Sequence, residues 1–208
     1  MAARFPFSNR KLILASRSPR RRYLLRLIGI PHTVAIPDVS EESFESEDPI
    51  EYVLRISELK ALSVKPEFSE GYILGADTTV VLDGKMLGKP RDQDEAREML
   101  KELGGRVHNV FTGLTLVDSA TSNKVQGYEK SLVKIRRLSQ WEIDAYISSG
   151  EPMDKAGAYG IQGYGAAIVE RIDGCYFNVV GLPIVRLLKL IRELDKICGG
   201  IGNGCKNI

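Results

Sequence analysis

Residues 12–28 read LILASRSPRRRYLLRLI, in which an apolar run, a short polar segment and a second apolar pattern follow one another. The first run, 12–15, is typical of a buried strand, and the polar segment is short enough for a tight turn. Ser18 followed by Pro19 predicts a helix start, because serine is a favoured N-cap and proline is tolerated best at the first helical position. The stretch therefore predicts a strand, a tight turn and a helix that begins at Pro19.

The predicted turn carries two hydroxyls and a run of arginines at the point where the helix begins. Free backbone N–H groups and the positive end of the helix dipole favour an anion there. The guanidinium of Arg20 or Arg21 offers a planar fork of donors that matches phosphate oxygens in pairs. The alternatives stay open at this point: the arginines form a phosphate site, or they are merely a solvated helix face or a nuclear-targeting patch.

Strands and helices alternate along the rest of the chain. Apolar and β-branched runs predict strands at 33–36, 72–82, 107–117, 124–135 and 166–172. Helical spacing and capping residues predict helices at 49–63, 92–103, 139–149 and 184–194. This alternation predicts an α/β fold, and the hairpin expected within 107–135 favours a mixed sheet over a purely parallel one.

One acid interrupts an otherwise apolar strand. Asp77 lies in the middle of 72–82, which is apolar and β-branched on both sides of it. A carboxylate inside a core strand is costly in free energy unless it is paired. Either the strand breaks at Asp77, or this residue has a function that justifies its burial.

Composition limits the class of protein. The chain has 208 residues, 43% of them hydrophobic and 27% charged, which suits one sizeable globular domain or a two-lobed one. Its formal net charge is +2, from 29 basic and 27 acidic residues. That balance is unsuited to a protein that coats DNA or an anionic membrane through bulk charge. Any anion site must therefore be local.

Cysteine usage and hydropathy predict a cytoplasmic protein. The three cysteines are an odd number without metal-ligand spacing, which is typical of a reducing compartment. No apolar run approaches the roughly 20 residues that span a bilayer. Residues 1–10 lack the apolar core of a secretory signal, although their basic, acid-free character leaves a very short organelle-targeting peptide open.

Two common nucleotide-binding motifs are not matched. Residues 84–90 resemble a P-loop, but their glycines are one residue too close and Pro90 stands where a metal-binding hydroxyl belongs. No Gly-x-Gly-x-x-Gly lies between a strand and a helix start, which argues against a dinucleotide cofactor. His108 has no catalytic partner at a recognisable spacing, and we expect it to be a structural residue.

A set of arginines and lysines with two isolated acids remains to be explained. Phosphate together with a divalent metal would unite them, because hard cations take carboxylate and phosphate oxygens at the same time. The members of this set are Arg20, Arg21, Glu41, Lys60, Asp77 and Lys89.

Six motifs occur in a fixed order: LASRSPRR at 14–21, GADT at 75–78, LGKP at 87–90, HNVFTG at 108–113, DKAGAYGIQG at 154–163 and NVVGLP at 178–183. Together they resemble the Maf family of nucleoside triphosphate pyrophosphatases, over nearly all of 12–194. The resemblance implies an α/β fold of the Maf and ITPase-like kind, with a curved mixed β-sheet flanked by helices and a central cleft between two lobes. We expect a single such domain over 12–197, after an N-terminal extension (1–11) and before a flexible C-terminal tail (198–208).

The resemblance implies hydrolysis of a nucleoside triphosphate to the monophosphate and pyrophosphate, with Mg²⁺ or Mn²⁺ as cofactor. Asp77 matches the family's catalytic acid, and Glu41 falls where a loop acid contributes to the site, so both are expected to bind the metal. The positions expected to bind substrate are Ser16, Arg20, Arg21, Lys60, Thr78, Lys89 and Gln162. The family also suggests a homodimer. The balanced charge of the chain argues against nucleic acid or a membrane as partner.

The segment 155–162 is similar to the family branch that takes dTTP and UTP. The sister branch, associated with 7-methyl-GTP, has an acid in place of Gln162. An amide both donates and accepts hydrogen bonds, as the imide edge of uracil or thymine requires. The alternatives are a pyrophosphatase for modified pyrimidine triphosphates, one of the 7-methyl-GTP type, and a non-catalytic nucleotide-binding regulator of cell division.

Overall fold

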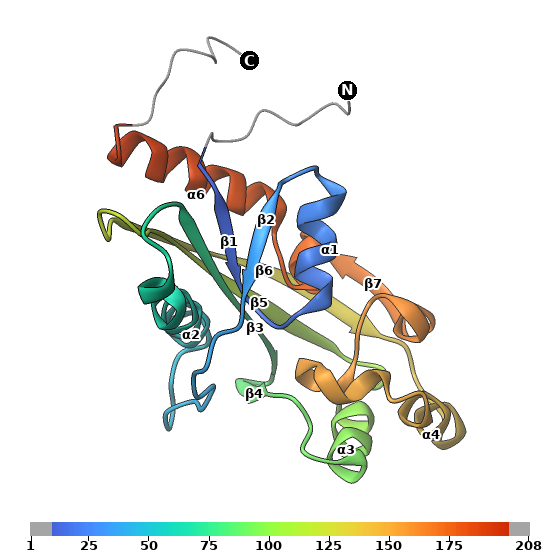
Figure 1. Ribbon diagram of the computed structural model, residues 1–208. Coiled ribbons are helices and arrows are strands. Elements are labelled where there is room, and N and C mark those ends of the chain that lie inside the picture. Colours follow the sequence, from blue (N-terminus) through green and yellow to red (C-terminus); the bar gives the residue numbers. More distant parts are fainter. Residues whose placement is uncertain (1–9, 200–208) are drawn as a thin grey trace.

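The computed structural model describes residues 10–199, which form an open, mixed seven-stranded sheet with helices on both faces (Figure 1). The strands are β1 (Leu12–Ala15), β2 (His32–Ala35), β3 (Tyr72–Leu82), β4 (Lys85–Leu87), β5 (Val107–Asp118), β6 (Lys124–Ile135) and β7 (Val169–Asp173). The helices are α1 (Pro19–Leu27), α2 (Pro49–Val64), α3 (Gln93–Leu103), α4 (Gln140–Ser148), α5 (Tyr176–Val180) and α6 (Ile184–Ile197). The expected α/β class with a mixed sheet is confirmed.

The strand order is β2–β1–β3–β5–β6–β7, and β4 pairs with the end of β3. β1 is parallel to both of its neighbours, whereas β3, β5, β6 and β7 pair antiparallel in sequence. Because β1 lies inside the sheet with helices on both faces, all four of its side chains are buried. This position explains why the strand is a continuous apolar run and not an alternating one.

The turn after β1 forms as its sequence predicts. Ser18 is the N-cap of α1, and its hydroxyl accepts a hydrogen bond from the backbone N–H of Arg21. Pro19 occupies the first turn of the helix. Residues 16–18, called the phosphate turn below, are thereby held at the carboxyl end of an interior strand.

β3 continues without a break through Asp77, which excludes the first of the two alternatives considered above. It pairs with β5 in one register from Tyr72 opposite Asp118 to Val81 opposite Asn109. Helix α2 packs directly across this pair: a Cβ on Gly75 would lie 1.9 Å from the carbonyl oxygen of Ser57. The glycine therefore lets α2 approach β3 closely, on the strand that carries Asp77.

Two large hydrophobic clusters lie toward opposite ends of β3 and β5. The first joins β1, α1 and α6 to the start of β3, and includes Val180. The second joins α3, α4 and the end of β3, and includes Val80 and Val110. All three valines also line one pocket, which therefore opens where the clusters meet. This arrangement corresponds to the two lobes and central cleft expected from the sequence.

Some element boundaries differ from the sequence predictions. The strand predicted at 166–172 begins only at Val169, because 163–167 form a 3-10 turn. The short elements β4 and α5 were not predicted, and α5 has no side-chain hydrogen bond at its N-cap that could have indicated it. The expected division into extension, domain and tail stays a prediction, since residues 1–9 and 200–208 lie outside the described part. Within 10–199, no helix is both long and apolar enough to cross a bilayer.

Candidate active site

A pocket of about 860 Å³ opens between the phosphate turn, β3, α2 and the segment 153–162. This volume lies in the range of small-molecule sites, about 300–1,000 Å³. The structure places every residue predicted for the site on its wall: Ser16, Arg20, Arg21, Glu41, Lys60, Asp77, Thr78, Lys89 and Gln162. Their individual roles stay predictions.

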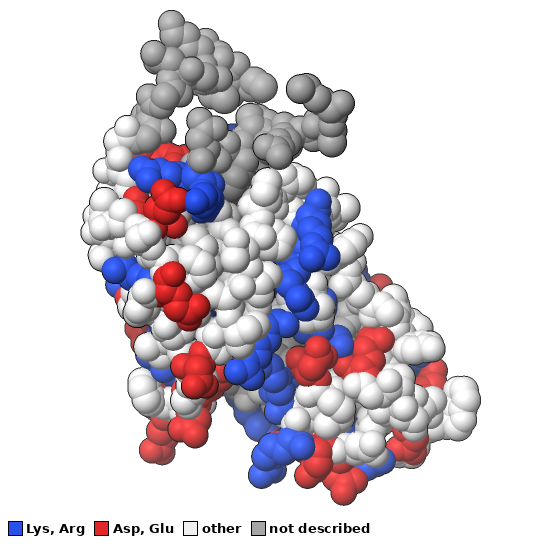
Figure 2. Space-filling model, in the orientation of Figure 1, with Lys and Arg blue, Asp and Glu red and all other residues white. Residues whose placement is uncertain are grey.

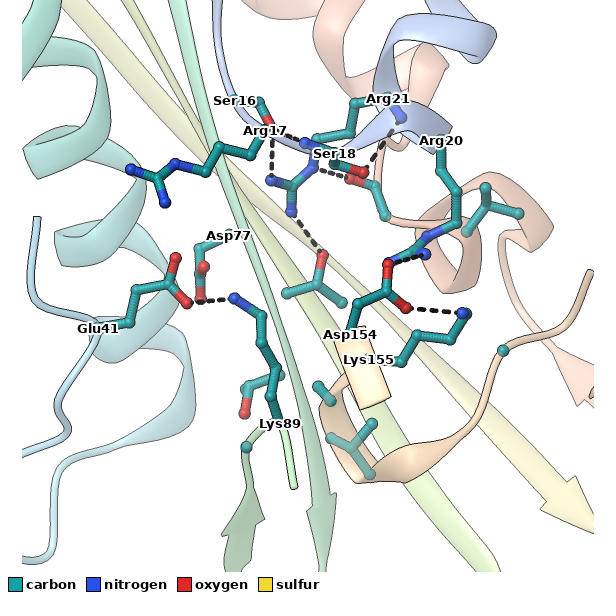
Figure 3. A pocket seen from close by; sticks show the side chains of 18 of the residues that line it. Ser16, Arg17, Ser18, Arg20, Arg21, Glu41, Asp77, Lys89, Asp154 and Lys155 are labelled. Atoms are coloured by element: carbon teal, nitrogen blue, oxygen red, sulfur yellow. Dashed lines mark hydrogen bonds and ion pairs between the residues drawn. The ribbon is translucent and has the colours of Figure 1, made fainter. Parts of the chain in front are cut away.

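Four charged side chains form an ion-pair network on the floor of the pocket. The Nζ atom of Lys60 lies 2.6 Å from Oδ1 of Asp77 and 2.7 Å from Oε1 of Glu41. The second carboxylate oxygen of Glu41 lies 2.7 Å from Nζ of Lys89 (Figure 3). Asp77 and Lys60 are both buried, so this ammonium group neutralises a carboxylate that water barely reaches.

The two carboxylates respond differently to this environment. Burial raises the pKa of Asp77, and this effect outweighs the opposing influence of Lys60 and Arg21. Burial alone would also raise the pKa of Glu41, but Lys60 and Lys89 lower it to about 2. Paired acids with pKa values moved apart are typical of sites where one carboxylate takes up protons and the other keeps its charge.

A loop at 36–48 presents Glu41 to the pocket. The hydroxyl of Tyr52 donates a 2.8 Å hydrogen bond to the backbone carbonyl of Glu41. Arg55 binds both oxygens of Glu47, at 2.6 and 2.7 Å, and its guanidinium lies 4.2 Å from the ring centroid of Phe44. Two side chains of α2 thus order an acidic stretch whose composition is typical of a solvated loop.

Arg21 holds several elements together. Its Nε donates to the carbonyl of Gly181 and its Nη1 to that of Ala76, both at 2.8 Å. Longer bonds reach the hydroxyls of Ser16 (3.3 Å) and Thr78 (3.1 Å). Since a guanidinium has five N–H donors, only one is left for a substrate. Burial lowers the pKa of Arg21, and Asp77 opposes that effect.

The hydroxyl of Thr78 belongs to a hydrogen-bond chain. It accepts from Arg21 and lies 2.9 Å from the hydroxyl of Thr112, which donates to the carbonyl of Asn178. Thr112 has one hydroxyl proton, so Thr78 must be the donor between the two threonines. Thr78 therefore has no proton left for a substrate and could only accept.

His108 is placed as a structural residue would be. It is 1% exposed, and its Nε2 lies 2.6 Å from the hydroxyl of Tyr159. Burial lowers the pKa of His108 to about 4, so the ring is neutral near pH 7. Tyr159 lines the pocket, whereas His108 stands behind it.

The electrostatic surface around the pocket is mixed. Figure 2 shows basic side chains that run down this face from α1 toward β4, with acidic side chains on either side. A local concentration of positive charge on a chain of nearly zero net charge suits a small anion better than a long polyanion.

The comparisons with known proteins agree with this geometry. A model of the Maf-like protein family matches residues 11–194. The chain belongs to the Maf-like family. It is 47% identical over 194 residues to the dTTP/UTP pyrophosphatase of Symbiobacterium thermophilum, covering 92% of this chain and 99% of that protein. It is 49% identical over 183 residues to the dTTP/UTP pyrophosphatase of Carboxydothermus hydrogenoformans, covering 88% and 98%.

Among solved structures, the Staphylococcus aureus Ham1 protein superposes with a TM-score of 0.42 and 13% identity. The superposition covers 60% of this chain and 71% of that chain.

Within the Maf-like motifs, the structure adds pocket residues that the sequence analysis did not single out. Nη1 of Arg20 lies 3.0 Å from Oδ2 of Asp154, whose other oxygen lies 2.8 Å from Nζ of Lys155. Figure 3 shows Arg17 of the phosphate turn and Arg20 of α1 pointing in opposite directions, Arg17 toward Glu41 and Arg20 toward Asp154. Arg17 could have been found from its place between the two turn serines; Asp154 had no signal beyond its motif.

Proposed function

We propose that this chain is a nucleoside triphosphate pyrophosphatase that converts dTTP and UTP to the monophosphate and pyrophosphate. The observation that carries the proposal is the buried Asp77–Lys60 pair, which faces the arginine-bearing phosphate turn across one nucleotide-sized pocket. The two relatives named dTTP/UTP pyrophosphatase, each similar over nearly its full length, support the choice of reaction and substrate.

Cleavage between the α- and β-phosphates requires neutralisation of the leaving pyrophosphate and a water molecule aimed at the α-phosphorus. Positioning and electrostatics do most of this work in phosphoryl transfer. Arg20, Lys60 and Lys89 are the cations best placed to hold the phosphate chain, because each already binds a carboxylate inside the pocket. We propose that phosphate oxygens replace the Glu41 carboxylate as partner of one or both lysines.

Asp77 is our candidate for the group that orients or deprotonates the attacking water. Its raised pKa brings it closer to the range in which a carboxylate accepts a proton effectively at neutral pH. The Nζ atom of Lys60, 2.6 Å from Oδ1 of Asp77, stabilises the ionised form of the Asp77 carboxylate. When the proton moves from water to Asp77, the hydroxide attacks the α-phosphorus and pyrophosphate leaves with the bonding electrons.

We further propose Mg²⁺ or Mn²⁺ as cofactor, held by Asp77 and Glu41. Within 10–199, no group of three or more His, Cys, Asp or Glu could hold a metal without further ligands. Two carboxylates nevertheless fit, because Mg²⁺ is usually bound by one or two carboxylates together with substrate phosphates and water. Lys60 already places one positive charge between these carboxylates. A bound metal would supply charge neutralisation and a lower water pKa.

Gln162 is our candidate for recognition of the base. It lines the pocket, and its amide can satisfy both the donor and the acceptors of a uracil or thymine edge. Modified pyrimidine triphosphates and 7-methyl-GTP are the alternative substrates. We also propose a cytoplasmic homodimer that binds neither nucleic acid nor membranes; the balanced charge supports this view of its partners.

The test is a panel of nucleoside triphosphates with detection of released pyrophosphate, in the presence of Mg²⁺ or Mn²⁺. We expect dTTP and UTP to be hydrolysed faster than ATP, GTP and 7-methyl-GTP, and we expect a chelator to stop the reaction reversibly. Faster hydrolysis of purine nucleotides would overturn the substrate assignment. Nucleotide binding without any turnover would favour the regulator over the enzyme.

A further inference from the structure

Residues 151–165, called the glutamine loop below, fold back on the side chain of their own first residue. Oε1 of Glu151 accepts hydrogen bonds from the Tyr146 hydroxyl at 2.9 Å and from the Gly165 N–H at 3.1 Å. Oε2 accepts from the Tyr164 N–H at 2.9 Å. One carboxylate therefore binds three donors, two of which belong to the far end of the loop.

Tyr146 closes the loop from the other side. Its hydroxyl accepts a 3.0 Å hydrogen bond from the Gly160 N–H while it donates to Glu151. The side chain projects from α4 and is 5% exposed, so it is fixed by packing in the second hydrophobic cluster. The backbone is thus anchored immediately before and after residues 161–163, the stretch that carries Gln162.

The loop leaves little space for another arrangement. Gly163 has a φ of +63°, and a Cβ at this position would lie 2.4 Å from Oε2 of Glu151. The backbone next to Gln162 is therefore pressed against the Glu151 carboxylate. Gln162 lines the pocket, whereas neither Glu151 nor Tyr146 is part of its wall.

From this arrangement we infer that Glu151 and Tyr146 are positioning residues that set nucleobase selectivity, because they fix the backbone that presents Gln162. The inference rests on the proposed function in that Gln162 is taken to face the base. A base-specific hydrogen bond needs a fixed amide, and a misplacement of 1 Å in a site can cost about 100-fold in rate. Within residues 10–199, no hydrogen bond joins the phosphate turn to Glu151 or Tyr146, and the turn is expected to work without them.

The decisive variant is E151Q. In the glutamine side chain, an amide N–H₂ donor replaces one of the two accepting carboxylate oxygens. A donor cannot bind the N–H or O–H groups that now point at it, so at least one of the three hydrogen bonds is lost. We expect kcat/KM for dTTP to fall by about tenfold or more, mainly through KM, since a tenfold change matches the loss of one good hydrogen bond. For ATP we expect a change of less than about threefold. Inhibition by inorganic pyrophosphate should stay the same.

Two further variants separate positioning from general destabilisation. Y146F removes the hydroxyl that joins Glu151 to Gly160. Like E151Q, it should lower the ratio of kcat/KM for dTTP to kcat/KM for ATP. E142Q is the matched control: Glu142 caps the same helix through Ser139, and it makes no hydrogen bond to the glutamine loop within the described residues. It should lower the melting temperature without changing selectivity.

A double-mutant cycle with Q162A tests whether Glu151 acts through Gln162. If it does, E151Q adds little to the loss that Q162A causes, because coupled residues are not additive. Independent, multiplicative effects would overturn the inference, as would an equal loss for dTTP and ATP or an unchanged ratio in E151Q. Should E151Q fail to fold, Y146F takes its place in the cycle.

Selectivity between dTTP and ATP can also be measured without turnover, as the ratio of their dissociation constants determined by calorimetry. A wild-type protein that binds nucleotides but releases no pyrophosphate would refute the proposed reaction, and the positioning inference would then be decided on the binding data. An active wild type with unchanged selectivity in both loop variants would refute the positioning inference alone.

Discussion

Asp77→Asn separates chemistry from stability at the floor of the pocket. The substitution keeps the size of the side chain but removes the negative charge beside Lys60. If Asp77 accepts the proton of the attacking water, its loss should lower kcat by about 10²–10⁴-fold, the usual contribution of a general base. KM for dTTP should change little, because Arg20 and Lys89 do not depend on Asp77 for their position.

The cost in stability should be smaller than for a typical broken ion pair. Removal of one partner of a buried pair costs about 3–5 kcal/mol when the remaining charge is left alone. Lys60 is not left alone, since Oε1 of Glu41 lies 2.7 Å from its Nζ. Burial also raises the pKa of Asp77, which means that its charged form is costly to bury. The neutral asparagine does not carry that cost, and this offsets part of the lost ion pair. We expect the free energy of unfolding to fall by less than about 2 kcal/mol.

The assay combines pyrophosphate release from dTTP with urea denaturation of the same preparations. Asp118→Asn is the control, because Asp118 is a buried carboxylate on β5 that lies outside the pocket. It should leave kcat unchanged. A kcat of D77N within about tenfold of wild type would refute the role of Asp77 as base. A loss of more than about 3 kcal/mol in unfolding free energy would refute the view that Glu41 still neutralises Lys60.

Three further variants probe the surroundings of the floor. The pKa of Glu41 is lowered from 4.5 to about 2, so the stability that its ionised form contributes is present above pH 4.5 and is lost as the pH falls toward 2. In urea titrations over this pH range, E41Q should therefore lose less stability than the wild type. Equal losses in the two proteins would contradict the ion pairs of Glu41. R21K should lower stability by about 2–4 kcal/mol in thermal unfolding, because lysine cannot reproduce the bonds to Gly181 and Ala76, and an unchanged melting temperature would argue against this clamp. G75A should be the most destabilising of the three in urea, since its methyl would collide with a backbone carbonyl of α2, whereas the same change at Gly88, where a Cβ meets nothing within 4 Å, should be tolerated.

Several features of the fold follow from neighbouring residues and were predictable. The N-cap at Ser18 and the capping box of Ser139 with Glu142 depend on hydrogen bonds over three residues, so the helix starts could be predicted. The strand 72–82 is a long β-branched run, and its boundaries match β3. The strand predicted at 166–172 was partly wrong, because Glu151 draws residues 164 and 165 into a turn. No local pattern shows that contact.

The candidate site was predictable in membership but not in arrangement. Every residue predicted for the site lines the pocket, but neither the motifs nor their spacing indicated a partner for any of the charged groups. The hydrogen bond that Arg21 donates to the carbonyl of Gly181 could not be predicted, because Arg21 and Gly181 are 160 positions apart in the sequence. Arg17 was overlooked because charge alone does not separate a pocket arginine from a solvated one in a basic run; only its place between the two turn serines distinguishes it.

By itself the sequence determined the local elements, the α/β class and the set of charged residues that chemistry at a phosphate requires. These depend on spacing along the chain, which capping, periodicity and turn preferences express directly. Only the tertiary structure decided that Lys60 stands between Asp77 and Glu41, and that the pKa of one acid is raised while that of the other is lowered. Burial and the distances between charges are properties of packing between distant segments, and they exist only once α2 has docked on β3.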